Sequence, residues 1–216
     1  MFIKLKRAGI AVLLLAASVL VPAQAANAAD GCGEGWFKYG DGYLEKEQKW
    51  EAGSRNAWIY HSGRVRFCTD NDTFDDDERR RALIGYPQDS YPFESWIIKN
   101  GAYSSFCVDQ TIKVHMSGIK TSESWSLGGS VSKDGPGINA SYSATYETLT
   151  VTIPGARVCG PDKSQLIART SGIVATAQDE SGKIEWVELH TNISGSYSVN
   201  GTKYGFSHTL SERDYS

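Results

Sequence analysis

The stretch TSESWSLGGSVSKDGPGINASYSATYETLTVTI, residues 121–153, carries the clearest two-residue period in the chain. Apolar and small polar residues alternate on both sides of residues 133–137, a Lys-Asp-Gly-Pro-Gly segment that no regular element accommodates. The alternation predicts two strands joined as an amphipathic hairpin. Pairing Val131 with Ile138 keeps every apolar side chain on one face, whereas a slip of one residue would mix the two faces.

Two interpretations of this hairpin are open. In the first, the serine and threonine row is the solvated side of an antiparallel sheet, and the apolar row faces a core. In the second, the two strands have about the length that a tilted strand needs to cross a bilayer, and the apolar row faces lipid. The side chains of the apolar row are Trp125, Leu127, Val131, Ile138, Tyr142 and Tyr146.

Under the second interpretation, residues 110–158 resemble the insertion hairpin of the aerolysin-like pore-forming toxins. The stems of that family are rich in Ser, Thr and Gly and carry charges at the turn, as Lys133 and Asp134 would here. The resemblance rests on composition and period. It implies a small β-pore-forming toxin that inserts this hairpin into a membrane.

The N-terminus has the features of a secretory signal. Lys4, Lys6 and Arg7 precede an apolar run that is too short to span a membrane, and small residues follow it up to Ala28. We expect residues 1–28 to be removed, which leaves a secreted, extracellular chain of about 190 residues. Loss of the three cations takes the formal charge from −3 to about −6, so nucleic acid is not expected as a partner.

All four cysteines follow the signal, and an even number in an exported chain predicts two disulfides. Their spacing is too wide for a zinc site of the usual kind. Three pairings are possible. The one we favour is sequential and joins Cys32 to Cys68 and Cys107 to Cys159.

The first half of the mature chain is less regular. Residues 44–52 have good helix propensity, and residues 57–68 alternate enough for a hairpin turning at His61-Ser62-Gly63. The acidic segment 70–78 suggests either a calcium site or a helix. We prefer the helix, capped by Thr73 and closed by Gly85, because acids lie in its first turn and arginines toward its end.

Aromatic residues near glycines and prolines are the candidate binding residues. Residues 30–42 predict turns and short extended pieces, residues 86–93 must be irregular because of their prolines, and Trp96 lies in a predicted strand at 95–98. The aromatic residues around the prolines, with Trp96, would form either an exposed recognition surface or plugs under a long loop. The candidates are Trp36, Tyr39, Tyr86, Tyr91 and Trp96.

The C-terminal third predicts two further hairpins. Strands at 166–177 and 183–191 flank the turn Glu180-Ser181-Gly182, and Asn200-Gly201 favours a type I′ turn with a two-residue register. That register pairs Val199 with Thr202 and continues to Ile193 with His208.

The sequence contains no motif for enzyme chemistry. The four histidines are far apart and form no metal pair, and the chain has neither a nucleophile elbow nor a phosphate loop. We therefore name no catalytic residue, metal or cofactor.

These observations predict a secreted, mainly β protein, an antiparallel sandwich or extended sheet with one or two short helices in its N-terminal half. We expect a mixed region of short helices and strands at 29–109 and an antiparallel β region at 110–216. The two regions form either one domain or two. The leading hypothesis is a non-enzymatic binding protein that recognises a protein or a cell-surface glycan, as an adaptor or subunit of an exported toxin or surface assembly. The alternatives are the pore-forming toxin, which alone requires a membrane, and an extracellular hydrolase.

Overall fold

The computed structural model describes residues 31–33, 35–52, 55–70, 79–86, 91–100, 105–160 and 165–216. The expected signal peptide lies outside these residues. All the regular structure described is β. The strands are β1 (Phe37–Ala52), β2 (Arg55–Thr69), β3 (Arg80–Ile84), β4 (Phe93–Asn100), β5 (Ser105–Ser117), β6 (Trp125–Gly129), β7 (Asn139–Ser143), β8 (Thr148–Cys159), β9 (Gln165–Thr170), β10 (Ile173–Ala177), β11 (Lys183–Val199) and β12 (Thr202–Tyr215).

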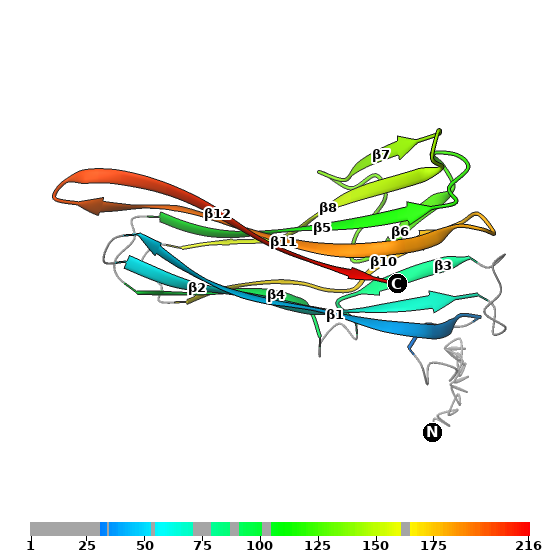
Figure 1. Cartoon of the computed structure of the whole chain (residues 1–216), viewed down its shortest axis with the longest axis horizontal. Helices are drawn as coiled ribbons and strands as arrows, with labels where there is room; N and C mark the ends of the chain where they lie inside the picture. The colour runs from blue at the N-terminus through cyan, green and yellow to red at the C-terminus, as the bar shows by residue number, and fades with distance from the viewer. Residues whose placement is uncertain are drawn as a thin grey trace, which may run out of the picture.

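The strands form two antiparallel sheets that pack face to face as an elongated sandwich (Figure 1). Sheet A has the order β6-β10-β3-β2-β4-β9, with β1 on the other edge of β2, and sheet B has the order β12-β11-β5-β8-β7. The long strand β2 organises sheet A. Its first half pairs with β4 through residues 56–62, and its second half pairs with β3 through residues 65–69.

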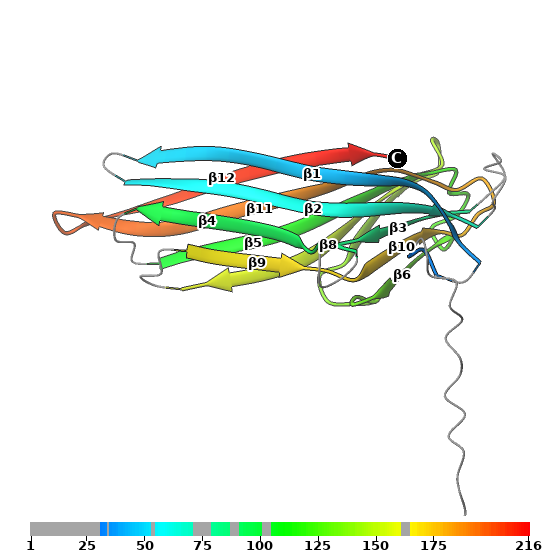
Figure 2. The ribbon, with the colours of Figure 1, turned by 90° about the horizontal axis from the view of Figure 1, so that it is seen from below.

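One long edge of the sandwich is closed by side chains. Strand β1 of sheet A runs beside β12 of sheet B (Figure 2). The ammonium of Lys46 donates to the carbonyl oxygen of Ser211 at 2.9 Å and forms an ion pair with Glu212 at 3.3 Å. Polar side chains on an edge strand also disfavour pairing with another chain.

The mainly β class is confirmed, but the expected short helices are absent from the described residues. Residues 44–52 lie in β1, which pairs with β2 along its whole length and buries Leu44. Helix propensity is weak compared with such tertiary pairing. Residues 71–78 of the second predicted helix lie outside the described part of the chain, and its expected last turn is instead the start of β3 at Arg80.

The hairpin predicted within residues 121–153 is wrong in its pairing. Both strands form, but β6 pairs with β10 in sheet A, whereas β7 pairs with β8 in sheet B. The chain leaves β6 at Gly129, whose φ of 80° and close approach to Gly172 leave no room for a side chain. Alternation identifies the buried face of a strand but not the strand it pairs with.

The apolar row of that segment does face the core in part. Trp125 is buried, and Leu127, Val131, Ile138 and Tyr142 pack against the larger apolar cluster. Tyr146 is instead exposed.

Two other predicted hairpins are also wrong. Gly63 lies in the middle of β2 and not in a turn. Strands β10 and β11 flank the turn at residues 179–182 but belong to different sheets, so the chain crosses between the layers there.

The third hairpin and the disulfides are confirmed. Asn200 and Gly201 both have positive φ, as a type I′ turn requires, and the ladder runs from Val199 with Thr202 to Ile193 with His208 in the predicted register. The disulfides join Cys32 to Cys68 and Cys107 to Cys159, which is the sequential pairing.

The space between the sheets contains two apolar clusters separated by a buried belt of polar side chains. The larger cluster includes Phe67, Ile112 and Leu149, and the smaller one includes Ile59, Phe106 and Ile193. Each of five strands contributes one inward polar residue between its apolar ones. The members of this polar belt are His61, Ser95, Gln110, Thr170 and Thr191.

The belt joins the two sheets by hydrogen bonds. Thr191 Oγ1 of sheet B lies 3.1 Å from His61 Nδ1 and 2.6 Å from Ser95 Oγ, both of sheet A. Gln110 donates from Nε2 to Ser95 Oγ at 2.8 Å and accepts at Oε1 from Thr170 at 2.6 Å. His61 is held through Nδ1 alone, since its buried Nε2 has no hydrogen-bond partner in the described structure. Unpaired buried polar groups are costly, so the paired atoms of the belt favour one register of the two sheets.

We predict that Gly63→Ala destabilises the fold. A Cβ at Gly63 would overlap the ring of the fully buried Phe93, and such overpacking typically costs about 1–3 kcal/mol. Gly128→Ala is the matched control, since the described structure has no heavy atom within 4 Å of a Cβ there. Urea unfolding measures both variants, and equal midpoints would contradict this role for Gly63.

We predict a loss of stability in acid that depends on His61. Burial above all, with the nearby charges of Lys46 and His190, lowers the pKa of His61 from 6.5 to about 4. Below pH 6.5 the His61 side chain binds a proton in the unfolded chain, whereas in the folded chain it stays neutral down to about pH 4. The free energy of unfolding therefore falls across this window by about 3 kcal/mol.

The control is His61→Gln, which keeps a hydrogen-bonding side chain but does not titrate. Its free energy of unfolding, measured by urea unfolding from pH 7 to pH 4, is expected to fall less than that of the parent protein. His115 and His190, whose pKa values burial also lowers, remain in both proteins, so the difference between the curves reports His61 together with its interaction with His190. If the free energy of unfolding falls equally with pH in both proteins, His61 does not cause the loss of stability in acid.

Candidate binding site

The outer face of sheet A carries aromatic and arginine side chains of β2 and its neighbours. Because side chains alternate along a strand, the residues next to the buried Ile59, Val65 and Ile97 point away from sheet B. The outward side chains of β2 and β4 are Trp58, Tyr60, Ser62, Arg64, Arg66, Glu94, Trp96 and Ile98.

The half of this face near the Cys32–Cys68 disulfide is an arginine-aromatic stack. A guanidinium lies over each ring at a distance typical of cation-π contacts. The stacks are Arg64 on Tyr91 at 4.3 Å, Arg66 on Tyr86 at 5.3 Å and Arg81 on Trp36 at 4.0 Å. One face of each ring is therefore already used within the protein.

The carboxylate of Asp41 belongs to the same half. Arg66 donates from Nε to Asp41 Oδ1 at 2.8 Å. Although partial burial opposes it, the hydrogen bonds from Arg66 and Lys38 lower the pKa of Asp41, so the carboxylate stays ionised. Asp41 thus compensates the positive charges of Arg66 and Lys38.

The other half of the face contains an open aromatic groove of about 340 Å³. We call it the aromatic groove. Its lining residues are Glu47, Trp58, Tyr60, Trp96 and Ile98. Trp58 is 40% exposed and Ile98 is 47% exposed, so both offer apolar surface to a ligand. The rings of Tyr60 and Trp96 meet edge to face, with centroids 5.7 Å apart, and form the floor.

Two polar groups of the groove rings are hydrogen bonded to carboxylates. The Tyr60 hydroxyl donates to Glu45 Oε1 at 3.0 Å, and Trp96 Nε1 donates to Glu94 Oε2 at 2.7 Å. Burial, together with the bond to Glu45, raises the pKa of Tyr60 to about 12. The hydroxyl therefore stays neutral, and both rings are held in fixed orientations.

The structure separates the five aromatic residues that the sequence suggested for binding. Trp96 lies in the aromatic groove. Trp36, Tyr86 and Tyr91 lie in the arginine-aromatic stack, and Tyr39 packs inward against Phe67 with ring centroids 6.0 Å apart.

Sequence reasoning missed three of the apolar side chains that line the groove, Trp58, Tyr60 and Ile98. The alternation of Trp58 and Tyr60 was visible, but it was interpreted as part of a short hairpin turning at residues 61–63. The signal that could have corrected this is the row of Ile59, Val65 and Phe67, which occupies the opposite parity.

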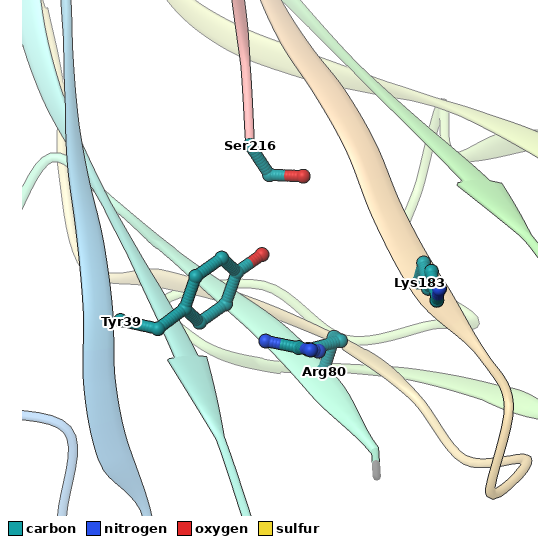
Figure 3. A pocket seen from close by; sticks show the side chains of 4 residues that line it. All are labelled: Tyr39, Arg80, Lys183 and Ser216. Carbon is teal, nitrogen blue, oxygen red and sulfur yellow. The ribbon is translucent and has the colours of Figure 1, made fainter. Parts of the chain in front are cut away.

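Tyr39 borders a second cavity of about 460 Å³ at one end of the sandwich (Figure 3). Arg80, Lys183 and Ser216 line it as well, and the Arg80 guanidinium stacks on the Tyr39 ring at 4.3 Å. Figure 3 shows the Tyr39 ring beside the Arg80 side chain, with Lys183 on strand β11 across from them. Two cationic side chains therefore line this cavity.

Within the described residues, no group of three or more His, Cys, Asp or Glu side chains is arranged to hold a metal ion. The same residues contain no helix long and apolar enough to cross a membrane.

No protein-family model matches the sequence, and no curated protein is significantly similar to it. Solved structures with some similarity include the collagen-binding domain from a Staphylococcus aureus adhesin, at 14% identity over 76% of this chain and 95% of that one, with a TM-score of 0.15. Another is the complete structure of manganese lipoxygenase of Gaeumannomyces graminis with a partial structure of zonadhesin of Komagataella pastoris, at 9% identity over 80% of this chain and 72% of that one, with a TM-score of 0.17. Similarity this low carries no argument about fold or function.

Proposed function

We propose that the protein is a secreted, non-enzymatic binding protein that recognises a partner at a cell surface, alone or as the recognition subunit of an exported assembly. The observation that carries this proposal is the open aromatic groove on the outer face of sheet A. Partly exposed tryptophan and tyrosine side chains on a rigid support are typical of binding hot spots.

The support of the groove is rigid for two reasons. Trp58, Tyr60 and Trp96 stand on β2 and β4, which are paired with each other and lie inside sheet A. Directly beneath them, the polar belt joins these two strands to sheet B. A preorganised surface loses little conformational entropy when it binds.

The positions of the histidine and the disulfides agree with this proposal. His61 is fully buried on the opposite side of β2 from the groove, so it cannot act on a molecule bound there. Two disulfides in a small β protein are compatible with an extracellular environment.

We predict that Trp58→Ala lowers binding of the fluorescently labelled mature protein to its target cells, because it removes a large exposed ring from the groove. Tyr204→Ala is the matched control, since Tyr204 is 45% exposed on the β11-β12 hairpin of sheet B. Flow cytometry against a panel of cell types measures both variants. Equal binding by Trp58→Ala and the parent protein would remove the groove as the recognition surface.

A pore-forming toxin remains a second candidate because of how residues 118–147 are placed. Strands β5 and β8 are direct neighbours, paired up to Met116 with Leu149, and this segment is the excursion between them. If β6 left β10 and β7 left β8, the segment could straighten and extend the β5-β8 pair. That change would expose the apolar row that resembles an insertion hairpin.

This second candidate predicts that a covalent lock blocks pore formation. Ser126 and Thr176 are paired across β6 and β10, so cysteines at both positions can join the strands. The oxidised Ser126→Cys/Thr176→Cys protein should release no dye from liposomes that the parent protein permeabilises, and reduction should restore release. If the parent protein leaves liposomes intact, the pore-forming candidate fails, and if the oxidised locked protein still releases dye, pore formation does not require β6 to leave β10.

A further inference from the structure

The aromatic groove combines three aromatic side chains with one carboxylate. The faces of three aromatic rings carry the negative part of their quadrupoles, and the carboxylate of Glu47 lines the same groove. The Tyr60 hydroxyl and the Trp96 N–H both donate to Glu45 and Glu94 instead of pointing to a ligand. The groove therefore offers acceptors more readily than donors, which favours a cation over a sugar.

A cation already lies at the rim of the groove. The ammonium of Lys49 is 5.6 Å from the ring centroid of Trp58, within the range of a cation-π contact. The indole of Trp58 can thus attract positive charge in this setting. Glu94 forms an ion pair with Arg169, which leaves Glu47 as the carboxylate that lines the groove.

The apolar wall shows which kind of cation fits. Ile98 is 47% exposed in the groove, so it would contact alkyl groups and could not satisfy a hydrated ammonium. A volume of about 340 Å³ is at the lower end of the range of small-molecule sites. Aromatic rings with a carboxylate are the known chemistry for quaternary ammonium groups.

We propose that the aromatic groove binds an alkylated ammonium group of the choline type, with Trp58, Tyr60 and Trp96 around the cation, Glu47 as its counter-charge and Ile98 against its methyl groups. This inference rests on the proposed binding function and names its ligand. The group could belong to a phosphatidylcholine headgroup or to a free small molecule, and the chemistry at the groove is the same.

The first experiment measures the affinity of the mature protein for choline chloride at constant ionic strength, by titration followed by tryptophan fluorescence and by calorimetry. The control ligand is 3,3-dimethyl-1-butanol, which has the shape of choline but no charge. Choline is expected to bind at least about fivefold more tightly, since a cation-π contact is worth roughly 1 kcal/mol or more. Equal affinities, or saturation by a neutral sugar and not by choline, would overturn the proposal.

Variants of the groove test the role of each group. Glu47→Gln and Trp58→Ala should each weaken choline binding by about fivefold or more, whereas Trp58→Phe should retain much of it. Lys49→Met should strengthen binding, because it removes a positive charge that competes for the Trp58 ring. Tyr204→Ala should bind as the parent protein does. Thermal unfolding confirms that each variant is folded, and unchanged affinity in Glu47→Gln and Trp58→Ala would overturn the proposal.

Vesicles separate the two sources of the ligand. Sedimentation with phosphatidylcholine vesicles, competed by free choline, would assign the group to a lipid headgroup, and binding of free choline alone would assign it to a soluble compound. Cell binding that depends on Trp58 but is not competed by choline would overturn this ligand and leave the proposed function standing. Cell binding that does not depend on Trp58 would overturn the proposed function itself.

Discussion

The fold depends on the polar belt that crosses the sandwich between its two apolar clusters. His61, Ser95 and Thr191 are fully buried, and an unpaired polar group in that position costs about 1–3 kcal/mol. With apolar contacts alone the two sheets could shift relative to each other, because exchanging one buried apolar contact for another of similar volume costs little free energy. The hydrogen bonds that Thr191 shares with His61 and Ser95 favour one arrangement of the two sheets. The belt therefore supplies specificity where the clusters supply most of the stability.

This constraint reaches the outer surface through β2 and β4. Because side chains alternate, fixing His61 and Ser95 inside the sandwich also fixes Tyr60 and Trp96 on the outside. The edge-to-face contact of these two rings and their hydrogen bonds to Glu45 and Glu94 then orient them further. The floor of the aromatic groove is rigid because His61 and Ser95, the chain neighbours of Tyr60 and Trp96, are hydrogen bonded to Thr191 on the inner side of the sheet.

How much of the fold the sequence predicts depends on how local the signal is. The hairpin at Asn200-Gly201 was predicted with its register because the turn type and the alternation lie within a few residues of each other. The hairpin at residues 121–153 was not, because its partners β10 and β8 are chosen by burial in two different sheets. Residues 44–52 became a strand for the same reason, since β2 offers a partner along their whole length.

The same distinction explains how much of the binding site could be predicted. The sequence identifies aromatic residues in exposed settings, but the side chain opposite each ring decides whether the ring is available. Tyr86 faces Arg66 and Tyr91 faces Arg64, so a cation of the protein already occupies one face of each. Trp96 instead contacts Tyr60 of the adjacent strand and donates its indole N–H to Glu94 of its own strand, and its groove stays open to a ligand. Composition cannot separate these cases because both use the same residue types. The pairing of β2 with β4 brings residues about forty positions apart side by side and so builds the groove. Lys49 also lies 5.6 Å from the Trp58 ring centroid, but its side chain does not line the groove.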